Sequence, residues 1–140
     1  MNTRTSFQLL LTGLFLLINA CVGGEVQTST DVRPEITVET IREDINGERV
    51  RVPAADGASE SRSWRFERNE PKEIEIIEKQ LAGDTAIITI NMRTSKAPRA
   101  EKPRKLSGRL RLHYKLETGW MLRQWEIVRI DNLSFAYEKQ

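Results

Sequence analysis

The segment that most restricts the fold is residues 106–116, LSGRLRLHYKL, because apolar and polar side chains alternate along it. One face of an extended chain would carry Leu106, Gly108, Leu110, Leu112, Tyr114 and Leu116, and the other Ser107, Arg109, Arg111, His113 and Lys115. A period of two over this length predicts a long β-strand with one buried and one solvated face. Residues 117–119 then predict a turn into residues 120–130, WMLRQWEIVRI, as the antiparallel partner. The change of apolar phase between Leu122 and Trp125 predicts a bulge in that partner.

Shorter patterns predict further strands. The segments ERVRV and SWRF alternate around residues 50–52 and 64–66, and the intervening PAADGASES has the composition of a loop. Residues 72–81 and 85–92 flank a Gly-Asp turn, which favours a hairpin. Residues 72–81 also fit a helix that begins at Pro71. We favour a strand with a bulge near Ile76 and Ile77, because a turn and a β-rich partner follow directly.

One helix is expected from about Thr37 to Asn46, since Val38, Ile41 and Ile45 share a helical face. Thr37 suits the N-cap and Gly47 suits the left-handed conformation after the last turn. A helix of this length is unstable alone and must pack on a sheet. We therefore expect one α+β domain over residues 35–138, with a short N-terminal helix packed on a curved antiparallel sheet of five to six strands, the tail LSFAYEKQ adding a last edge.

The element order, the bent strand and the closing pattern G-W-x-L-x-x-W-E at residues 119–126 resemble the cystatin/NTF2-like group of curved sheets wrapped around a helix. Residues 36–135 are also similar to small bacterial lipoproteins of unknown function. The resemblance implies a fold, and it brings no catalytic motif with it.

The first twenty residues have the features of a secretory signal peptide. Arg4 lies in a short positive region, and residues 7–18, FQLLLTGLFLLI, are uncharged and mostly apolar. This run is shorter than the roughly 20 apolar residues that span a bilayer. We therefore exclude residues 1–20 from the folded domain.

The end of this segment, Ile18-Asn19-Ala20-Cys21, resembles the bacterial lipobox. The resemblance implies cleavage before Cys21, acylation of its sulfur and amino group, and a bacterial envelope protein held in the membrane by lipid. Val22 in place of Asp implies the outer membrane, facing the periplasm. Residues 21–34 would form the lipidated N-terminus and a flexible tether. The alternative is an ordinary free Cys after a signal sequence, and no internal disulfide is available because Cys21 is the single Cys.

Residues 93–111 contain eight basic residues and one acid, although the whole chain has a formal charge of only +2. Within this segment we name five candidates for binding an anionic partner: Arg99, Lys102, Arg104, Lys105 and Arg109. The partner classes that remain open are anionic lipid, an acidic glycan and an acidic protein. Nucleic acid is not expected, because no aromatic residues are interleaved for base stacking. The alternative is a solvated hairpin loop whose charges only prevent aggregation.

Other candidates for chemistry have simpler structural interpretations. His113 has no partner motif in the sequence and is expected to be an exposed strand residue. The carboxylates of Glu73, Glu75 and Glu78 are expected to face solvent opposite basic residues of a neighbouring strand. Trp64, Trp120 and Trp125 are expected to fill the core rather than to line a ligand cavity.

We therefore expect a non-enzymatic binding module with no catalytic residue, metal or cofactor. The alternative is a small-molecule binder or enzyme with a cavity between helix and sheet. The sequence leaves the oligomeric state open.

Overall fold

The computed structural model describes residues 33–54, 61–96 and 104–139. These residues form one helix and seven strands: α1 (Val38–Asp44), β1 (Arg49–Val52), β2 (Arg62–Arg65), β3 (Lys72–Ala82), β4 (Thr85–Lys96), β5 (Arg104–Thr118), β6 (Arg123–Asn132) and β7 (Ala136–Tyr137). The predictions for residues 1–32, including Cys21, and those for Arg99 and Lys102 lie outside the described residues.

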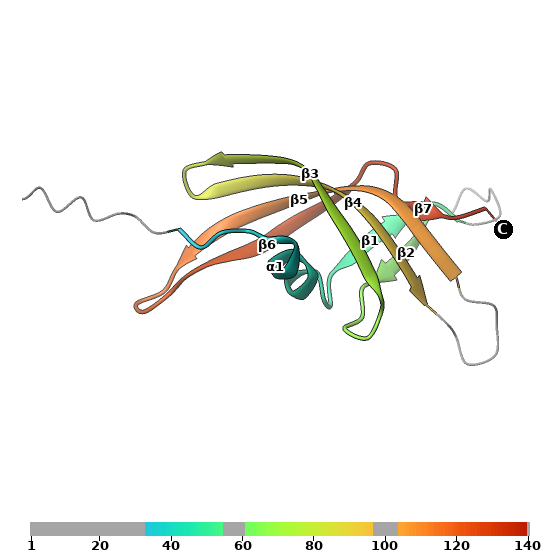
Figure 1. Ribbon diagram of the computed structural model, residues 1–140, viewed down its shortest axis with the longest axis horizontal. Coiled ribbons are helices and arrows are strands. Elements are labelled where there is room, and N and C mark those ends of the chain that lie inside the picture. The colour runs from blue at the N-terminus through green and yellow to red at the C-terminus, as the bar shows by residue number, and fades with distance from the viewer. Residues whose placement is uncertain (1–32, 55–60, 97–103, 140) are drawn as a thin grey trace, which may run out of the picture. The chain divides into compact units, whose positions relative to one another are not determined.

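The strands form two antiparallel sheets (Figure 1). The main sheet has the order β3-β4-β5-β6, and β7 pairs with β5 beyond the end of β6. A small second sheet contains β1 and β2 alone, paired from Arg49↔Arg65 to Val52↔Arg62. The long hairpins β3–β4 and β5–β6 extend in the same direction in Figure 1, away from β7.

The expected fold class is wrong. The protein is mostly β, with a helix of seven residues and seven strands in two sheets, and not a helix packed on one curved sheet of five to six strands. The single curved sheet wrapped around a helix, which the resemblance to the cystatin/NTF2-like group implied, is therefore not observed. The physical reason is local, because β1 and β2 pair with each other across their connecting loop and so form a separate ribbon. The helix is also shorter than expected, since Ile45 is already the C-cap.

The local signals at the ends of the helix are confirmed. The Thr37 side chain accepts a hydrogen bond from the backbone N–H of Thr40 at 3.2 Å and caps the first turn. Gly47 has a φ of +90°, the left-handed conformation that glycine adopts most easily. Its N–H donates to the carbonyl oxygen of Phe66 at 2.8 Å, which joins the end of the helix to the residue directly after β2.

The hairpin of β3 and β4 is also confirmed, including its bulge. Residues 72–81 are a strand and not a helix, and the pairing shifts between Ile76 and Glu78. The bulge expected in the partner of β5 lies elsewhere. Tyr114 pairs with Ile127 and His113 with Arg129, so the extra residue is Val128. Residues 120–122 are not part of β6, which begins at Arg123.

The core lies on one face of the main sheet and follows the alternation of β5. Leu106, Leu110, Leu112, Tyr114 and Leu116 are all buried, as the sequence predicts. The same cluster contains apolar side chains from the helix, both sheets and the last turn: Ile41, Ile45, Val52, Phe66, Ile88, Ile90, Met92, Trp125 and Phe135. Burial of this continuous apolar surface is the main favourable contribution to folding.

Gly108 marks the place where β5 changes partners. Leu110 is the last β5 residue paired with β6, and Ser107 is the first paired with β7. Gly108 lies between them with a φ of +138°. A Cβ atom built there would lie 2.2 Å from the carbonyl oxygen of Ser134, so only glycine allows the chain to cross this closely.

Candidate functional site

The face of the main sheet opposite the core is polar, and we call it the outer face. It carries a row of side chains from each strand: Glu73, Glu75 and Glu78 from β3, Asn91 and Arg93 from β4, Lys105, Arg109, Arg111, His113 and Lys115 from β5, and Glu126, Arg129 and Asp131 from β6. The acidic side chains of β3 and the basic side chains of β5 are separated by β4. This arrangement follows from the period of two, which places every second residue of a strand on the same face.

The basic row of β5 consists of Lys105, Arg109, Arg111 and Lys115, and all four are exposed. Lys115 forms an ion pair with Glu117 at 2.9 Å. Arg109 and Arg111 make no ion pair with any other residue that the structure describes. Two exposed guanidinium groups on alternate residues of one strand lie roughly 7 Å apart along its direction. They therefore present two adjacent donor forks to an anionic partner.

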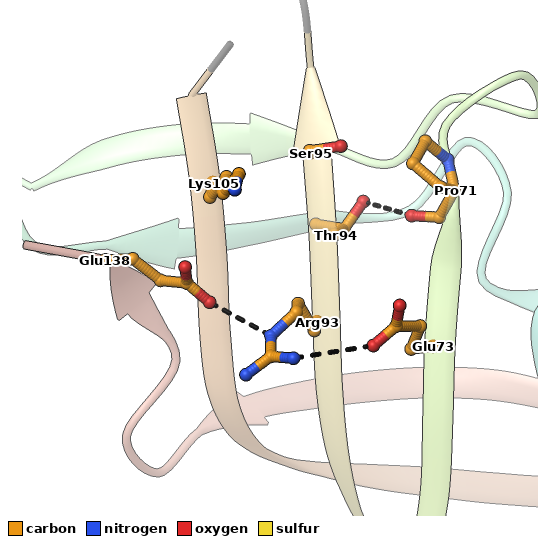
Figure 2. Close-up of a pocket in the computed structure, with 7 residues that line it drawn as sticks. All are labelled: Pro71, Glu73, Arg93, Thr94, Ser95, Lys105 and Glu138. Atoms are coloured by element: carbon orange, nitrogen blue, oxygen red, sulfur yellow. Dashed lines mark hydrogen bonds and ion pairs between the residues drawn. The ribbon is translucent and has the colours of Figure 1, made fainter. Parts of the chain in front are cut away.

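Arg93 occupies the centre of a groove at the end of the outer face (Figure 2). The groove has a volume of about 460 Å³ and is lined by Pro71, Glu73, Arg93, Thr94, Ser95, Lys105 and Glu138. Arg93 Nε lies 3.1 Å from Glu138 Oε1, and Arg93 Nη1 lies 3.6 Å from Glu73 Oε2. Arg93 thus links β3 to the chain after β7 and is largely neutralised. Of the residues around it, Lys105 supplies the positive charge of the groove.

The expected pairing of the β3 carboxylates holds for one of the three. Glu73 lies opposite Arg93 and contacts it. Glu75 lies opposite Asn91 and Glu78 opposite Thr89, so neither faces a basic residue across the strand pair. Glu78 instead accepts a hydrogen bond from Gln80 Nε2 at 2.6 Å. These carboxylates therefore form a solvated acidic edge.

Lys96, the other basic residue at the end of β4, has a structural role. Its ammonium group pairs with Glu67, lies 3.8 Å from Glu70 Oε1, and lies over the Trp64 ring at 5.6 Å from the centroid. Glu70 is almost fully buried, and burial raises its pKa although the Lys96 charge opposes the change. Thr94 Oγ1 donates to the Pro71 carbonyl at 2.8 Å and lies 3.3 Å from Glu70 Oε2. This cluster fixes the turn before β3.

His113 is partly buried and has a partner, which corrects the expectation of an exposed residue without one. His113 Nε2 lies 2.7 Å from Asp131 Oδ2, and Arg129 Nε lies 3.1 Å from Asp131 Oδ1. A carboxylate only accepts, so the histidine nitrogen carries the hydrogen of this bond. The hydrogen bond with His113, with the Arg129 charge added, lowers the pKa of Asp131. The three side chains form a cross-strand ionic cluster.

Buried polar groups also occur beneath the sheet, where the end of α1 meets β5. Burial is the largest cause that raises the pKa of Asp44 and of Tyr114, and the Asp44 charge raises the Tyr114 pKa further. Neither residue lines any of the three surface grooves that we describe, which have volumes of about 460, 540 and 230 Å³.

The three tryptophans have two different positions. Trp64 and Trp125 belong to the core, and Trp125 Nε1 donates to the Pro34 carbonyl at 2.8 Å. Trp120 is 95% exposed, so the expectation that it fills the core is wrong. Its sequence position gave a signal, because it directly follows the predicted turn.

The comparisons with known proteins give no family for this chain. No protein-family model matches it, and neither a curated protein nor a solved structure matches it significantly. Within residues 33–54, 61–96 and 104–139, no three His, Cys, Asp or Glu side chains are grouped so as to hold a metal ion. The described part of the chain also contains no helix of the length and apolarity needed to cross a bilayer.

Proposed function

We propose that this protein is a lipid-anchored, non-enzymatic binding module of the bacterial envelope. Its anchor would be acyl chains on Cys21, in the outer membrane and facing the periplasm. Each buried methylene contributes about 0.8 kcal/mol, so two or three acyl chains hold a protein where one does not. The domain would bind an extended anionic partner through the basic row of β5.

The observation that carries the binding proposal is that Arg109 and Arg111 are exposed and form no ion pair with a described residue. Both are exposed on the outer face, and neither forms an ion pair with another described residue, although Asp131 of β6 lies opposite Arg111 in the strand register. Arg93 and Lys96, from the same basic segment, are already held by carboxylates. An extended anionic chain laid along β5 would meet Lys105, Arg109 and Arg111 in order. Acidic glycans and acidic peptides have this linear form.

The apolar character of the core favours binding at this surface over binding between the helix and the sheet. Ile41 and Ile45 of α1 are fully buried within the same apolar cluster as Ile88, Ile90 and Leu112 of the main sheet. The grooves that we describe lie at the surface, and two of them adjoin the outer face.

The first prediction concerns the anchor. Intact mass spectrometry of the detergent-extracted protein should give a species that lacks residues 1–20 and is heavier than residues 21–140 by the mass of its acyl groups. The physical reason is cleavage before an acylated Cys21. A mass that matches an unmodified chain would refute the anchor and leave Cys21 as an ordinary thiol.

The second prediction concerns the basic row. The detergent-extracted protein, reconstituted in nanodiscs of neutral phosphatidylcholine, should bind fluorescent dextran sulfate with an affinity that falls as salt rises. The double variant Arg109→Gln/Arg111→Gln should weaken binding about 30-fold, since each basic side chain near an anionic surface contributes about 1 kcal/mol. Fluorescence anisotropy over a salt series measures both effects.

A matched control is available on the small sheet. Arg49 and Arg51 are exposed and also lie on alternate residues of one strand, β1. The variant Arg49→Gln/Arg51→Gln removes the same charge and should leave the affinity nearly unchanged. Equal losses in the two double variants would mean that only net charge matters, and the proposed site on β5 would then be wrong.

A further inference from the structure

The turn between β5 and β6 exposes three consecutive large apolar side chains. Trp120 is 95% exposed, Met121 71% and Leu122 76%. The last strand pair before the turn is Thr118↔Arg123, and the N–H of Gly119 donates to the Leu122 carbonyl at 2.9 Å. The three side chains therefore belong to a closed turn beyond the end of the sheet, which we call the apolar tip.

The residue types of the apolar tip are unusual for a turn. Tight turns favour Gly, Asn, Asp, Pro and Ser, which fit the backbone and remain in water. Contiguous apolar groups on a soluble surface usually mark a contact with a protein or a membrane. The described part of the chain does not bury these side chains, because its core ends at the pair of Leu116 and Trp125, two residues before the last strand pair. A departure of this kind from local rules is expected at a functional site.

The chain enters the domain at the same end of the main sheet as the apolar tip (Figure 1). The Pro34 carbonyl accepts a hydrogen bond from Trp125, five residues after Trp120. Arg33 Nη1 donates to the carbonyl of Gly83, in the turn between β3 and β4. Residues 22–33 cannot extend more than about 40 Å from Cys21. A membrane that holds Cys21 is therefore within reach of this end of the domain.

We propose that the apolar tip inserts into the surface of the bilayer that holds the lipid anchor. This inference rests on the proposed function, and it adds a second, non-covalent membrane contact. Tryptophan suits the boundary between headgroups and acyl chains, because its ring is apolar and its N–H finds polar partners. Met121 and Leu122 add the apolar surface that favours insertion. Such a contact fixes which end of the domain faces the membrane.

Insertion also orients the binding face. Lys115 is the residue of the basic row nearest the tip, and it pairs with Thr85 at the start of β4. Arg109 lies further from the tip along β5, where it pairs with Asn91. With the tip in the bilayer, the row from Lys115 to Lys105 would run away from the membrane. Arg109, Arg111 and Lys105 would then be available to a partner in the aqueous compartment.

Tryptophan quenching by brominated phosphatidylcholine tests the inference in vesicles that carry the detergent-extracted protein. Only Trp120 of the three tryptophans is exposed, and residues 1–32 contain none. We expect brominated lipid to quench the part of the emission that Trp120→Phe removes, up to about a third of the total if the three tryptophans emit equally. Buried Trp64 and Trp125 should emit equally in brominated and ordinary vesicles.

Two further variants separate insertion from accidental collision. Met121→Ser/Leu122→Ser keeps the Trp120 reporter and should reduce its quenching several-fold, because the apolar surface for insertion is lost. Val128→Ser removes an exposed apolar side chain from β6 outside the tip and should leave quenching unchanged. Absence of Trp120 quenching, or quenching that survives loss of Met121 and Leu122, would overturn the inference.

The same preparation distinguishes this failure from failure of the anchor. Intact mass reports the acylation of Cys21, whereas quenching reports the contact of Trp120. An acylated protein with an unquenched Trp120 would refute the apolar tip alone. A protein without acyl groups would refute the anchor, and Trp120 quenching would then show whether the tip meets the bilayer without it.

Discussion

Gly108→Ala should destabilise the domain by about 4 kcal/mol or more, enough to unfold a large fraction of a marginally stable protein. A Cβ atom at this position would lie 2.2 Å from the Ser134 carbonyl oxygen and 2.7 Å from Phe135 Cα. Both are backbone atoms, so no flexible side chain can move aside. The φ of +138° adds strain for any residue with a Cβ. Urea unfolding followed by circular dichroism measures the loss.

The matched control for this prediction is Gly83→Ala, in the turn between β3 and β4. Gly83 also has a positive φ, +61°, but a Cβ built there meets no atom within 4 Å. The cost should be limited to the backbone strain of a left-handed alanine, about 1 kcal/mol. If Gly108→Ala costs no more than Gly83→Ala, then β5 and the segment around Ser134 do not cross as closely as described.

The place of Gly108 explains what the sequence predicts and what it does not. Strict alternation places Gly108 on the buried face of the strand, and this is confirmed. Alternation says nothing about the partner on either side of a strand. The change from β6 to β7 at Gly108 depends on the close approach of Ser134, which lies 26 residues later. Local alternation cannot predict this long-range contact, and it also could not predict that β1 and β2 pair with each other as a sheet of their own.

For the candidate site too, the sequence predicts which face a residue occupies but not its partners on the neighbouring strands. The predicted face of β5 places Arg109 and Arg111 together on the surface, because both positions follow from a period of two. Asp131 was missed as the partner of His113, since the extra residue at Val128 shifts the register of β6. A register counted from the turn without knowledge of this bulge assigns the wrong partner to His113. The exposure of Trp120 was missed because residues 120–122 were assigned to the strand and not to the turn.

Asn132→Ala should destabilise the protein by about 2–3 kcal/mol, since one side chain connects three backbone groups. Asn132 Nδ2 donates to the Arg51 carbonyl at 2.7 Å and to the Phe135 carbonyl at 2.8 Å. Asn132 Oδ1 accepts from the Phe135 N–H at 2.7 Å. These bonds join β1 of the small sheet to the turn between β6 and β7. For a domain of this size, thermal unfolding should shift down by roughly 10 °C or more.

The effect should exceed the loss of three ordinary surface bonds because Phe135 is fully buried and packs against Phe66, with the ring centroids 5.9 Å apart. Without Asn132, the Phe135 backbone loses the contacts that hold its ring against the small sheet. Asn91→Ala is the matched control, because Asn91 is an exposed asparagine of β4 without a side-chain hydrogen bond to another described residue. It should change the midpoint little. Equal shifts for the two variants would mean that the small sheet is held by apolar packing alone, and that Asn132 does not couple it to the sheet that carries the basic row.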